Sequence, residues 1–466
     1  MTVSHTTTQP LRDYQRVAVD AVVGCERGLS VLACGTGKTR VAAAAALPGS
    51  STGRRVVVFV PTLALLEQTL QAWLAVVPNG FAALGVCSQA VRGSEDIDVS
   101  ELSVASTTDP AQVAEWVAAQ AGRDVVVFAT YQSAPVIAAA HTEFGLPVWS
   151  TMVCDEAHRI AGPRSKAFGV VLDDARIPAE RRLFYTATPR IHASGADTDL
   201  VEVSSSATVS SMDNPALFGE RAFTLSTREA IDAGWLSDYR LAVIAVTDTE
   251  IQATLAHLDT VTVGEHAVSA HDAATIIALH KAVDDYQLRS VLVFHNTIAA
   301  SRTFTTAVEH LHEALGPARP VSAIHVDGGD SLATRRAALD TLHTPPQGGW
   351  SLVSNARCFS EGIDVPALDA VVFAQARTSP IDVAQAVGRA IRRNPDRSEP
   401  SLIILAVIVD THADPEHAIE DSEFVKTRRV IAALEDHDPT LATDLAHLRH
   451  HTTTDTDSRS DPGDDV

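Results

Sequence analysis

Short apolar runs without polar interruption recur along the chain, and they limit its fold more than any other feature of the sequence. A strand that is buried on both faces of a sheet shows such continuous hydrophobicity. The runs lie at residues 56–60, 125–128, 152–154, 183–185, 291–294, 351–353 and 370–373. Stretches with helical spacing of apolar residues lie between them, as at 63–76, 111–121 and 299–315. This alternation predicts an α/β protein built from βαβ units, with enough strands for two parallel sheets flanked by helices.

Two changes of pattern divide the chain into domains. Serine-rich and polar residues interrupt the alternation between 190 and about 238, so we expect one domain over 1–238 and a second over 239–410. Apolar residues at roughly helical spacing follow, which indicates a short helical C-terminal extension over 411–450. The polar tail at 451–466 carries five aspartates from Asp455 onward, and we expect it to be acidic and disordered.

Composition excludes several classes of protein. With 45% hydrophobic and 20% charged residues, the 466-residue chain falls in the globular range. Its longest apolar runs are far shorter than the roughly 20 residues that a membrane-spanning helix needs, and its polar start is unlike a signal peptide. Five scattered cysteines without a C-x-x-C pair favour a reducing compartment, so we expect a cytoplasmic protein without a membrane partner. The net charge of -22 argues against coating nucleic acid by bulk electrostatics, although a local basic groove would still bind it.

A glycine turn follows the apolar stretch 29–33 and precedes an alanine-rich helical stretch. In a phosphate loop, glycines let backbone N–H groups close on the phosphates, a lysine reaches the β- and γ-phosphates, and a hydroxyl binds Mg²⁺. The residues that fit these roles are Gly35, Thr36, Gly37, Lys38 and Thr39. Leu32 stands where the full G-x-x-x-x-G-K-T pattern has its first glycine, so a chance glycine-rich turn is the alternative. Only four of the 36 cationic residues are lysines, which leaves few other candidates for the lysine role.

Two adjacent carboxylates, Asp155 and Glu156, come directly after the apolar run 152–154, and Ala157 and His158 follow them. At the carboxyl end of a strand, such a pair suits a site in which Asp155 holds Mg²⁺, usually through water, and Glu156 polarises the water that attacks the γ-phosphate. A solvated acidic turn is the alternative for this pair alone. Together with Lys38, the pair predicts an ATP site with bound Mg²⁺.

A basic segment at 385–393 has helical spacing of its polar residues. Gln385, Arg389 and Arg392 stand at i, i+4 and i+7, which places them on one face of a helix. Such a face can bring guanidinium groups to a triphosphate, where an arginine finger raises the rate of phosphoryl transfer by about 10³- to 10⁵-fold. The alternative is a solvated basic helix end.

As a set, these motifs resemble those of a known family. The glycine turn with Lys38, the Asp-Glu-Ala-His box at 155–158, Thr-Ala-Thr-Pro at 186–189 and the segment 385–392 are similar to motifs I, II, III and VI of superfamily 2 helicases. The resemblance covers about residues 10–410 and is closest to the DEAH-box branch related to type III restriction subunits. It implies two RecA-like domains with ATP bound between them and nucleic acid running across both.

The resemblance also gives weaker motifs a role. Gln15, in the segment 11–15, would hydrogen-bond the adenine of ATP. Gly362 and Asp364, in a segment like motif V, would lie near the nucleotide. Contacts with nucleic acid would come from Pro61 and Thr62 (motif Ia), Thr130 and Tyr131 (motif Ib), His295 and Asn296 (motif IV), and Arg357. For Gln15 the alternative is a polar residue that caps the first helix, and for the other residues it is a structural turn role.

We therefore expect an ATP-dependent helicase or translocase with ATP and Mg²⁺ as cofactors. DNA is favoured over RNA as its substrate, by analogy with the branch that the chain resembles. The alternatives are a nucleic-acid-stimulated ATPase switch, and an ATPase subunit of a restriction or defence complex without unwinding of its own. None of the four lysines has Asp or Glu two residues before it, so a restriction-type nuclease is not expected in this chain. A protein partner could bind through the C-terminal extension.

Overall fold

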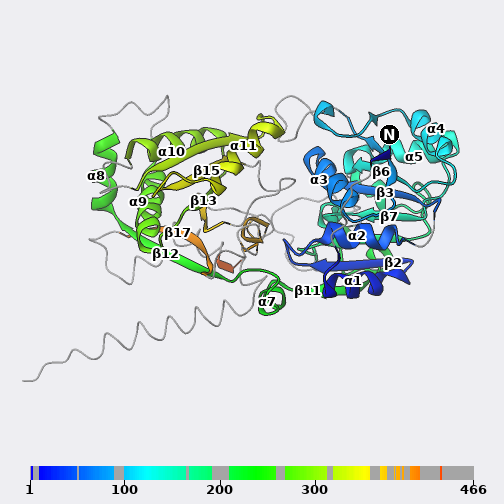
Figure 1. Ribbon diagram of the computed structural model, residues 1–466, viewed down its shortest axis with the longest axis horizontal. Helices are drawn as coiled ribbons and strands as arrows, with labels where there is room; N and C mark the ends of the chain where they lie inside the picture. The colour runs from blue at the N-terminus through cyan, green and yellow to red at the C-terminus, as the bar shows by residue number, and fades with distance from the viewer. Residues whose placement is uncertain are drawn as a thin grey trace, which may run out of the picture.

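The computed structural model consists of two lobes, each with a parallel sheet between helices (Figure 1). It describes residues 2–3, 10–49, 52–88, 99–163, 167–191, 209–258, 268–311, 319–356, 368–374, 383, 385–388, 391–392, 399–409 and 431–432. Apart from 431–432, the predicted helical extension and acidic tail lie outside these residues. Two parallel-strand sheets flanked by helices confirm the predicted fold class.

The first lobe contains a nine-stranded sheet in the order β1-β4-β6-β3-β7-β9-β2-β11, with β5 beside β4. The strands are β1 (Thr2–Val3), β2 (Arg27–Leu32), β3 (Arg55–Val60), β4 (Phe81–Val86), β5 (Ser106–Thr107), β6 (Val125–Thr130), β7 (Thr151–Cys154), β9 (Arg182–Thr186) and β11 (Glu220–Leu225). All pairs are parallel except β1 with β4. The four apolar runs predicted in this lobe are the buried strands β3, β6, β7 and β9.

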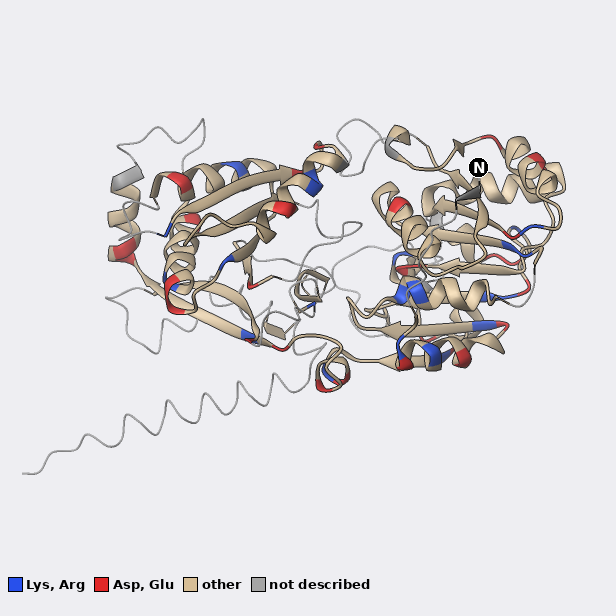
Figure 2. Cartoon of the chain, viewed as in Figure 1, with Lys and Arg blue, Asp and Glu red and all other residues tan. Residues whose placement is uncertain are grey.

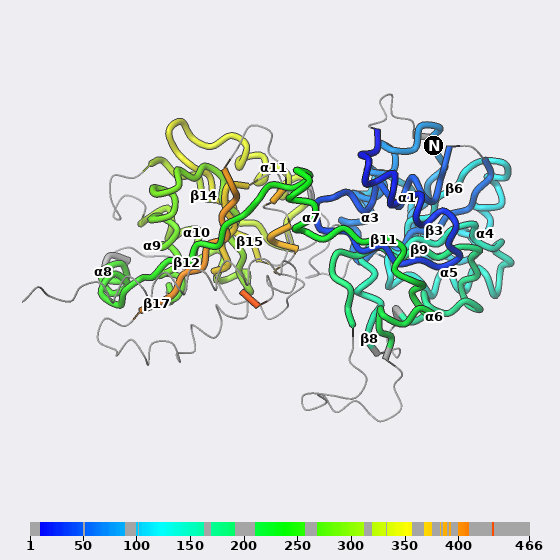
Figure 3. The backbone as a smooth tube through the Cα atoms, turned by 90° about the horizontal axis from the view of Figure 1, so that it is seen from below, coloured from blue at the N-terminus to red at the C-terminus, as the bar shows by residue number. Residues whose placement is uncertain are grey.

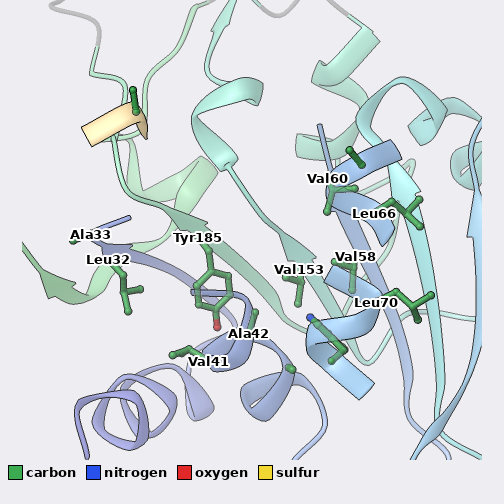
Figure 4. Packing of buried hydrophobic residues seen from close by; sticks show 14 of the residues in the cluster. Leu32, Ala33, Val41, Ala42, Val58, Val60, Leu66, Leu70, Val153 and Tyr185 are labelled. Atoms are coloured by element: carbon green, nitrogen blue, oxygen red, sulfur yellow. The ribbon is translucent and has the colours of Figure 1, made fainter. Parts of the chain in front are cut away.

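Helices cover both faces of this sheet and fix where the loops emerge. They are α1 (Asp13–Val23), α2 (Lys38–Ala46), α3 (Leu63–Leu74), α4 (Pro110–Ala119), α5 (Ala134–Phe144), α6 (Pro215–Phe218) and α7 (Thr227–Asp232). Figure 4 shows Val41 and Ala42 of α2 facing Val153 and Tyr185 of the sheet within one buried cluster. Alanine favours the helix and lets it approach the sheet closely, so the alanine-rich sequence seats α2, and the loop before it, firmly on the core.

The second lobe contains a six-stranded sheet in the order β12-β17-β16-β13-β15-β14, with every pair parallel. The strands are β12 (Tyr239–Thr247), β13 (Ser290–His295), β14 (Val321–Asp327), β15 (Trp350–Ala356), β16 (Ala370–Phe373) and β17 (Ser401–Val409). The helices between them are α8 (Asp248–Leu258), α9 (Ala270–Asp285), α10 (Ile298–Leu311) and α11 (Leu332–His343). The predicted runs at 291–294, 351–353 and 370–373 lie within β13, β15 and β16.

The chain passes between the lobes through α7, which follows β11 of the first sheet and precedes β12 of the second (Figure 3). The chain therefore leaves the first sheet at Leu225 and enters the second at Tyr239. This change lies next to the predicted domain boundary at residue 238. Charged residues of both signs are spread over both lobes (Figure 2). No helix within the described ranges is both long and apolar enough to cross a membrane.

Candidate active site

The phosphate loop lies between the end of β2 and the start of α2. Gly35 and Gly37 both have φ of 83°, a left-handed conformation that side chains disfavour. Gly37 is also restricted by space, because a Cβ there would lie 2.6 Å from Nε2 of Gln15. The Thr36 hydroxyl donates to the carbonyl of Ala33 at 2.7 Å and closes the turn. The loop thus presents backbone N–H groups at a helix N-terminus, which is a favourable place for phosphate.

Two residues of α1 hold this loop from outside. The Gln15 side chain is buried, and its Nε2 donates to the carbonyl of Thr36 at 2.9 Å. Its Oε1 accepts from the backbone N–H of Arg12 at 3.0 Å, so both ends of the amide have protein partners. The Tyr14 hydroxyl donates to the same Thr36 carbonyl at 2.5 Å, a contact that the sequence analysis missed. The adenine contact of Gln15 stays a prediction, and the observed bonds give Gln15 a role in shaping the loop.

Lys38 begins α2 and points at the acidic box. Its Nζ lies 3.7 Å from Oε1 of Glu156, and both side chains are largely buried. Burial alone would lower the pKa of Lys38, but the nearby negative charges, that of Glu156 first, outweigh it and raise the pKa. The lysine is therefore protonated, and its charge is available for a phosphate.

Asp155 follows β7, and its side chain contacts Thr39, the second residue of α2. Its Oδ2 accepts from the Thr39 hydroxyl at 3.2 Å, and its Oδ1 accepts from the backbone N–H of Glu156 at 2.9 Å. Burial, and then the neighbouring charge of Glu156, raise the pKa of Asp155 to about 6. The described residues hold no cluster of three or more metal-ligating side chains. One carboxylate beside one hydroxyl nevertheless fits Mg²⁺, which takes few protein ligands and completes its shell with water and phosphate oxygens.

Glu156 adopts an unusual backbone conformation. Its φ and ψ are 49° and 48°, in the left-handed region, and Gln287 is the one other described non-glycine residue with positive φ. Such a conformation costs about 1–3 kcal/mol and is typical of functional sites, where surrounding bonds enforce it. Here it turns the carboxylate toward Lys38 and brings its Oε2 within 3.4 Å of Nδ1 of His158.

His158 connects the acidic box to the end of β9 and the residues just after it. Its Nδ1 lies 3.1 Å from the Thr186 hydroxyl and 3.5 Å from the Thr188 hydroxyl. Burial lowers the pKa of His158 to about 4 against the opposing charge of Glu156, so the ring is neutral at pH 7. The structure therefore joins motifs II and III through a neutral imidazole.

Residues of the second lobe pack directly on the phosphate loop. A Cβ added to Gly388 would lie 2.2 Å from Cβ of Cys34. The Gly388 carbonyl oxygen lies 3.2 Å from the position that a Cβ added to Gly35 would take. Cγ of Arg392 lies 3.6 Å from that same position. The sequence analysis did not predict this contact, and the feature that could have indicated it is the glycine before Arg389, because a side chain at 388 would not fit.

Gln385 is buried beside this contact, with 3% of its surface exposed. Neither its amide oxygen nor its amide nitrogen has a hydrogen-bond partner in the described part of the chain. A buried amide without partners costs about 1–3 kcal/mol, so it suits a group that bonds to a ligand or to water. Burial lowers the pKa of Arg392, and the nearby Cys34 partly offsets this by raising it. Arg389 lies outside the described residues, as do Gly362, Asp364 and Arg357.

Three of the residues predicted to contact nucleic acid are buried. Thr130 and Tyr131 are buried, and the Thr130 hydroxyl pairs with that of Ser133 at 3.0 Å. His295 is fully buried against the ring of Phe304, at 4.8 Å between ring centroids. The protein covers these side chains, so contact with a bound strand stays a prediction for these residues and would have to use their backbone groups.

Three other residues predicted to contact nucleic acid lie at strand ends. Asn296 is exposed after β13, and Thr62 is half-buried, where its hydroxyl accepts from the N–H of Leu65 at 3.2 Å and caps α3. Pro61, just before it, is buried. Direct contact through Thr62 or Asn296 stays a prediction, whereas Pro61 could take part only through its backbone.

Tyr131 instead stabilises the acidic box, and its replacement by phenylalanine should show this. Its hydroxyl donates to the Asp155 carbonyl at 2.7 Å, and its ring stacks on Phe59. Tyr131→Phe should lower the free energy of unfolding by about 1 kcal/mol, since it leaves a buried carbonyl without this donor. Tyr185 is equally buried, but its hydroxyl has no hydrogen-bond partner among the residues that the structure describes, so Tyr185→Phe should be neutral or stabilising. Urea denaturation of both variants tests this, and equal losses would contradict it.

Comparison with known proteins agrees with this arrangement. A family model described as type III restriction enzyme, res subunit, matches residues 8–191, and one described as helicase conserved C-terminal domain matches residues 274–394. Together the two matches support a superfamily 2 helicase of the ResIII-like branch. The two matches fall on the two lobes, so this family's two domains follow one another in the order that the motifs predict.

Solved structures and curated relatives support the same family. The DNA-bound structure of LlaBIII, an ATP-dependent Type ISP restriction-modification enzyme, is 27% identical with a TM-score of 0.79, over 93% of this chain and 30% of that one. "Probable helicase A859L" of African swine fever virus (isolate Tick/South Africa/Pretoriuskop Pr4/1996) is 27% identical over 400 residues. The protein of the same name from strain Badajoz 1971 Vero-adapted is 28% identical over 386 residues. Each viral match covers 81% of this chain and only 38% of the relative.

Proposed function

We propose that the chain is an ATP-dependent helicase or translocase that acts on DNA and hydrolyses ATP where its two lobes meet. One observation carries the proposal. The carboxyl ends of β2 and β7 bring Lys38, Thr39, Asp155 and Glu156 together, and Gly388 of the second lobe packs against the same phosphate loop. A single triphosphate on that loop would be within reach of both lobes.

The roles of the first lobe follow from its contacts. When ATP binds, the amine of Lys38 would leave Glu156 and pair with the β- and γ-phosphates. The Glu156 carboxylate would then be free to orient the attacking water and accept its proton. Thr39 and Asp155 would hold Mg²⁺, which neutralises charge on the phosphates when bound. His158 keeps Glu156 and the end of β9 in register.

The roles of the second lobe are proposed from its place against the loop. Gln385 carries a buried amide that has no partner among the described residues and that could bond to the γ-phosphate or the attacking water. Arg389 and Arg392 would stabilise the charge that develops in the transition state. Gly362 and Asp364 would approach the nucleotide from the same lobe. Hydrolysis would then require both lobes to be seated together.

DNA is proposed as the nucleic acid because the LlaBIII structure, which this chain resembles over 93% of its length, is bound to DNA. The exposed Asn296 and half-buried Thr62 lie at strand ends of the two lobes and would contact the strand, as would Arg357. A strand that crosses both lobes would favour their closed arrangement and so stimulate hydrolysis.

The second candidate is an ATPase subunit of a restriction or defence complex that does not unwind DNA by itself. The observation that favours it is the coverage: this chain corresponds to 30% of LlaBIII, so the match is to one part of a larger restriction-modification enzyme. The activity of the whole relative therefore does not transfer with the fold.

One experiment separates these functions. The ATPase rate should be measured without nucleic acid and with single-stranded DNA, duplex DNA or RNA, followed by strand displacement on duplexes with 3′ or 5′ tails. We expect stimulation by DNA and displacement of at least one tailed duplex. Stimulation without displacement would favour the subunit or switch function, and the absence of stimulation by any nucleic acid would reject the proposed function.

A further inference from the structure

The chain crosses from one lobe to the other in the junction segment, residues 234–238, and its aromatic residue packs on the first lobe. The ring of Trp235 lies 5.2 Å from that of Tyr14, and the Arg12 guanidinium lies 5.3 Å from the centroid of Trp235. Tyr14 in turn donates to the Thr36 carbonyl of the phosphate loop. Trp235 therefore rests on the same residues that hold the loop.

The next residues of the junction segment bond to the second lobe. The backbone N–H of Ser237 donates to the Ile391 carbonyl at 2.8 Å, and its hydroxyl donates to the Arg392 carbonyl at 3.3 Å. The Asp238 carbonyl accepts from the N–H of Ser401 at 3.0 Å, where β17 begins. Hydrogen bonds therefore connect the end of motif VI to Ser237, two residues after Trp235.

Leu236 lies between these two sets of contacts and touches the phosphate loop itself. It is buried, and its Cδ2 lies 3.3 Å from the Cβ position of Gly35. It also forms an isolated antiparallel bridge with Arg392. Trp235, Leu236 and Ser237 are consecutive in the sequence. The first packs on the α1 residues that hold the phosphate loop, the second contacts the loop itself, and the third bonds to motif VI.

The first lobe holds the junction segment in place. The backbone N–H groups of Trp235 and Leu236 both donate to the Ala230 carbonyl, at 2.8 and 3.1 Å, and close the end of α7. Gly234 allows this turn with φ of 70°. The rotation of the segment about this anchor is limited by the ring of Trp235 against Tyr14.

We propose that Trp235 is a positioning residue that sets motif VI against the phosphate loop. By fixing the junction segment on Tyr14 and Arg12, the ring determines where Ser237 holds Ile391 and Arg392, and hence where Gln385 and Arg389 meet the nucleotide. Trp235 itself does not touch the reacting atoms. This inference rests on the proposed function, because it assigns a residue that the nucleic-acid-stimulated reaction needs.

The test compares Trp235→Ala, Trp235→Leu and Trp235→Phe with Trp116→Ala, which removes a half-buried tryptophan of α4 in the first lobe. We expect Trp235→Ala and Trp235→Leu to lower the kcat of DNA-stimulated hydrolysis by about 10- to 100-fold, as misplacement of a catalytic group does. The KM for ATP should stay within about two-fold, because ground-state binding is not changed. Trp235→Phe keeps a ring on Tyr14 and should restore most of the rate, and Trp116→Ala should match the wild type.

A second readout does not depend on turnover. The tryptophan fluorescence of the wild type should change when single-stranded DNA and a non-hydrolysable ATP analogue are added together, and Trp235→Phe should lack this change. Persistence of the change in Trp235→Phe would contradict the inference. So would an unchanged kcat in Trp235→Leu, or a raised KM with unchanged kcat, which would place Trp235 in base binding. If the wild type shows no stimulation by nucleic acid, it is the proposed function that fails.

Discussion

Replacing Lys38 by alanine is expected to abolish ATP hydrolysis. The lysine is the first residue of α2, it is protonated, and its amine lies 3.7 Å from Glu156 at the centre of the site. Loss of one group that stabilises charge in a transition state costs about 10²- to 10³-fold in rate where it has been measured for an oxyanion hole, and we expect at least this loss here. Binding of ATP should weaken as well, since in the proposed site the same charge would contact the bound phosphates. Steady-state hydrolysis and equilibrium binding of a fluorescent ATP analogue measure the two effects.

Lys281 provides the matched control for this replacement. It lies on the surface of the second lobe, where its amine pairs with Glu250 at 2.8 Å and both side chains are 39% exposed. An exposed pair of this kind contributes at most about 1 kcal/mol to stability. Lys281→Ala should therefore hydrolyse ATP like the wild type. A Lys38→Ala protein with near wild-type turnover would contradict the phosphate-loop assignment.

Replacing Glu156 by glutamine is expected to separate binding from turnover. Glutamine keeps the shape of the side chain but cannot accept the proton of the attacking water, and removal of such a base costs about 10²- to 10⁴-fold in rate. Lys38, Thr39 and Asp155 remain, so affinity for ATP with Mg²⁺ should be retained or raised. Binding and single-turnover hydrolysis should be measured on the same preparation.

The control for this variant is Glu250→Gln, which makes the same chemical change on the surface and should leave hydrolysis unchanged. Loss of ATP binding in Glu156→Gln would mean that the carboxylate is structural. That result is a real alternative, because Glu156 has a left-handed backbone and contacts both Lys38 and His158. Retained turnover would remove Glu156 from the proposed chemistry.

The sequence predicts the centre of each sheet well and the edges less well. Strands such as β3 and β13 are buried on both faces, so their continuous apolar runs are visible in the sequence. Strand β11 was not predicted, because most of its side chains are exposed or half-exposed and it joins the sheet through backbone pairing with β2. Pairing of this kind leaves no hydrophobic signal. The stretch that interrupts the predicted alternation therefore contains an edge strand.

The site shows the same division between local and distant contacts. Lys38 and Asp155 could be placed from short motifs, because each follows a strand and the carboxyl ends of parallel strands share an edge. The packing of Trp235 on Tyr14 could not be predicted, since nothing near either residue specifies the other. Tyr131 was assigned to a bound strand because its segment follows a strand and resembles motif Ib, but a turn folds it inward onto Asp155.

The central claim, that the second lobe completes the ATP site, is tested most directly by Gly388→Ala. The added methyl would lie 2.2 Å from Cβ of Cys34, so motif VI could no longer seat on the phosphate loop. Gly24→Ala is the matched control, because a Cβ there meets nothing within 4 Å and the backbone is helical. We predict that Gly388→Ala binds ATP like the wild type and loses about 10- to 100-fold of its DNA-stimulated hydrolysis. Full stimulated hydrolysis by Gly388→Ala would show that the two lobes do not share one ATP site.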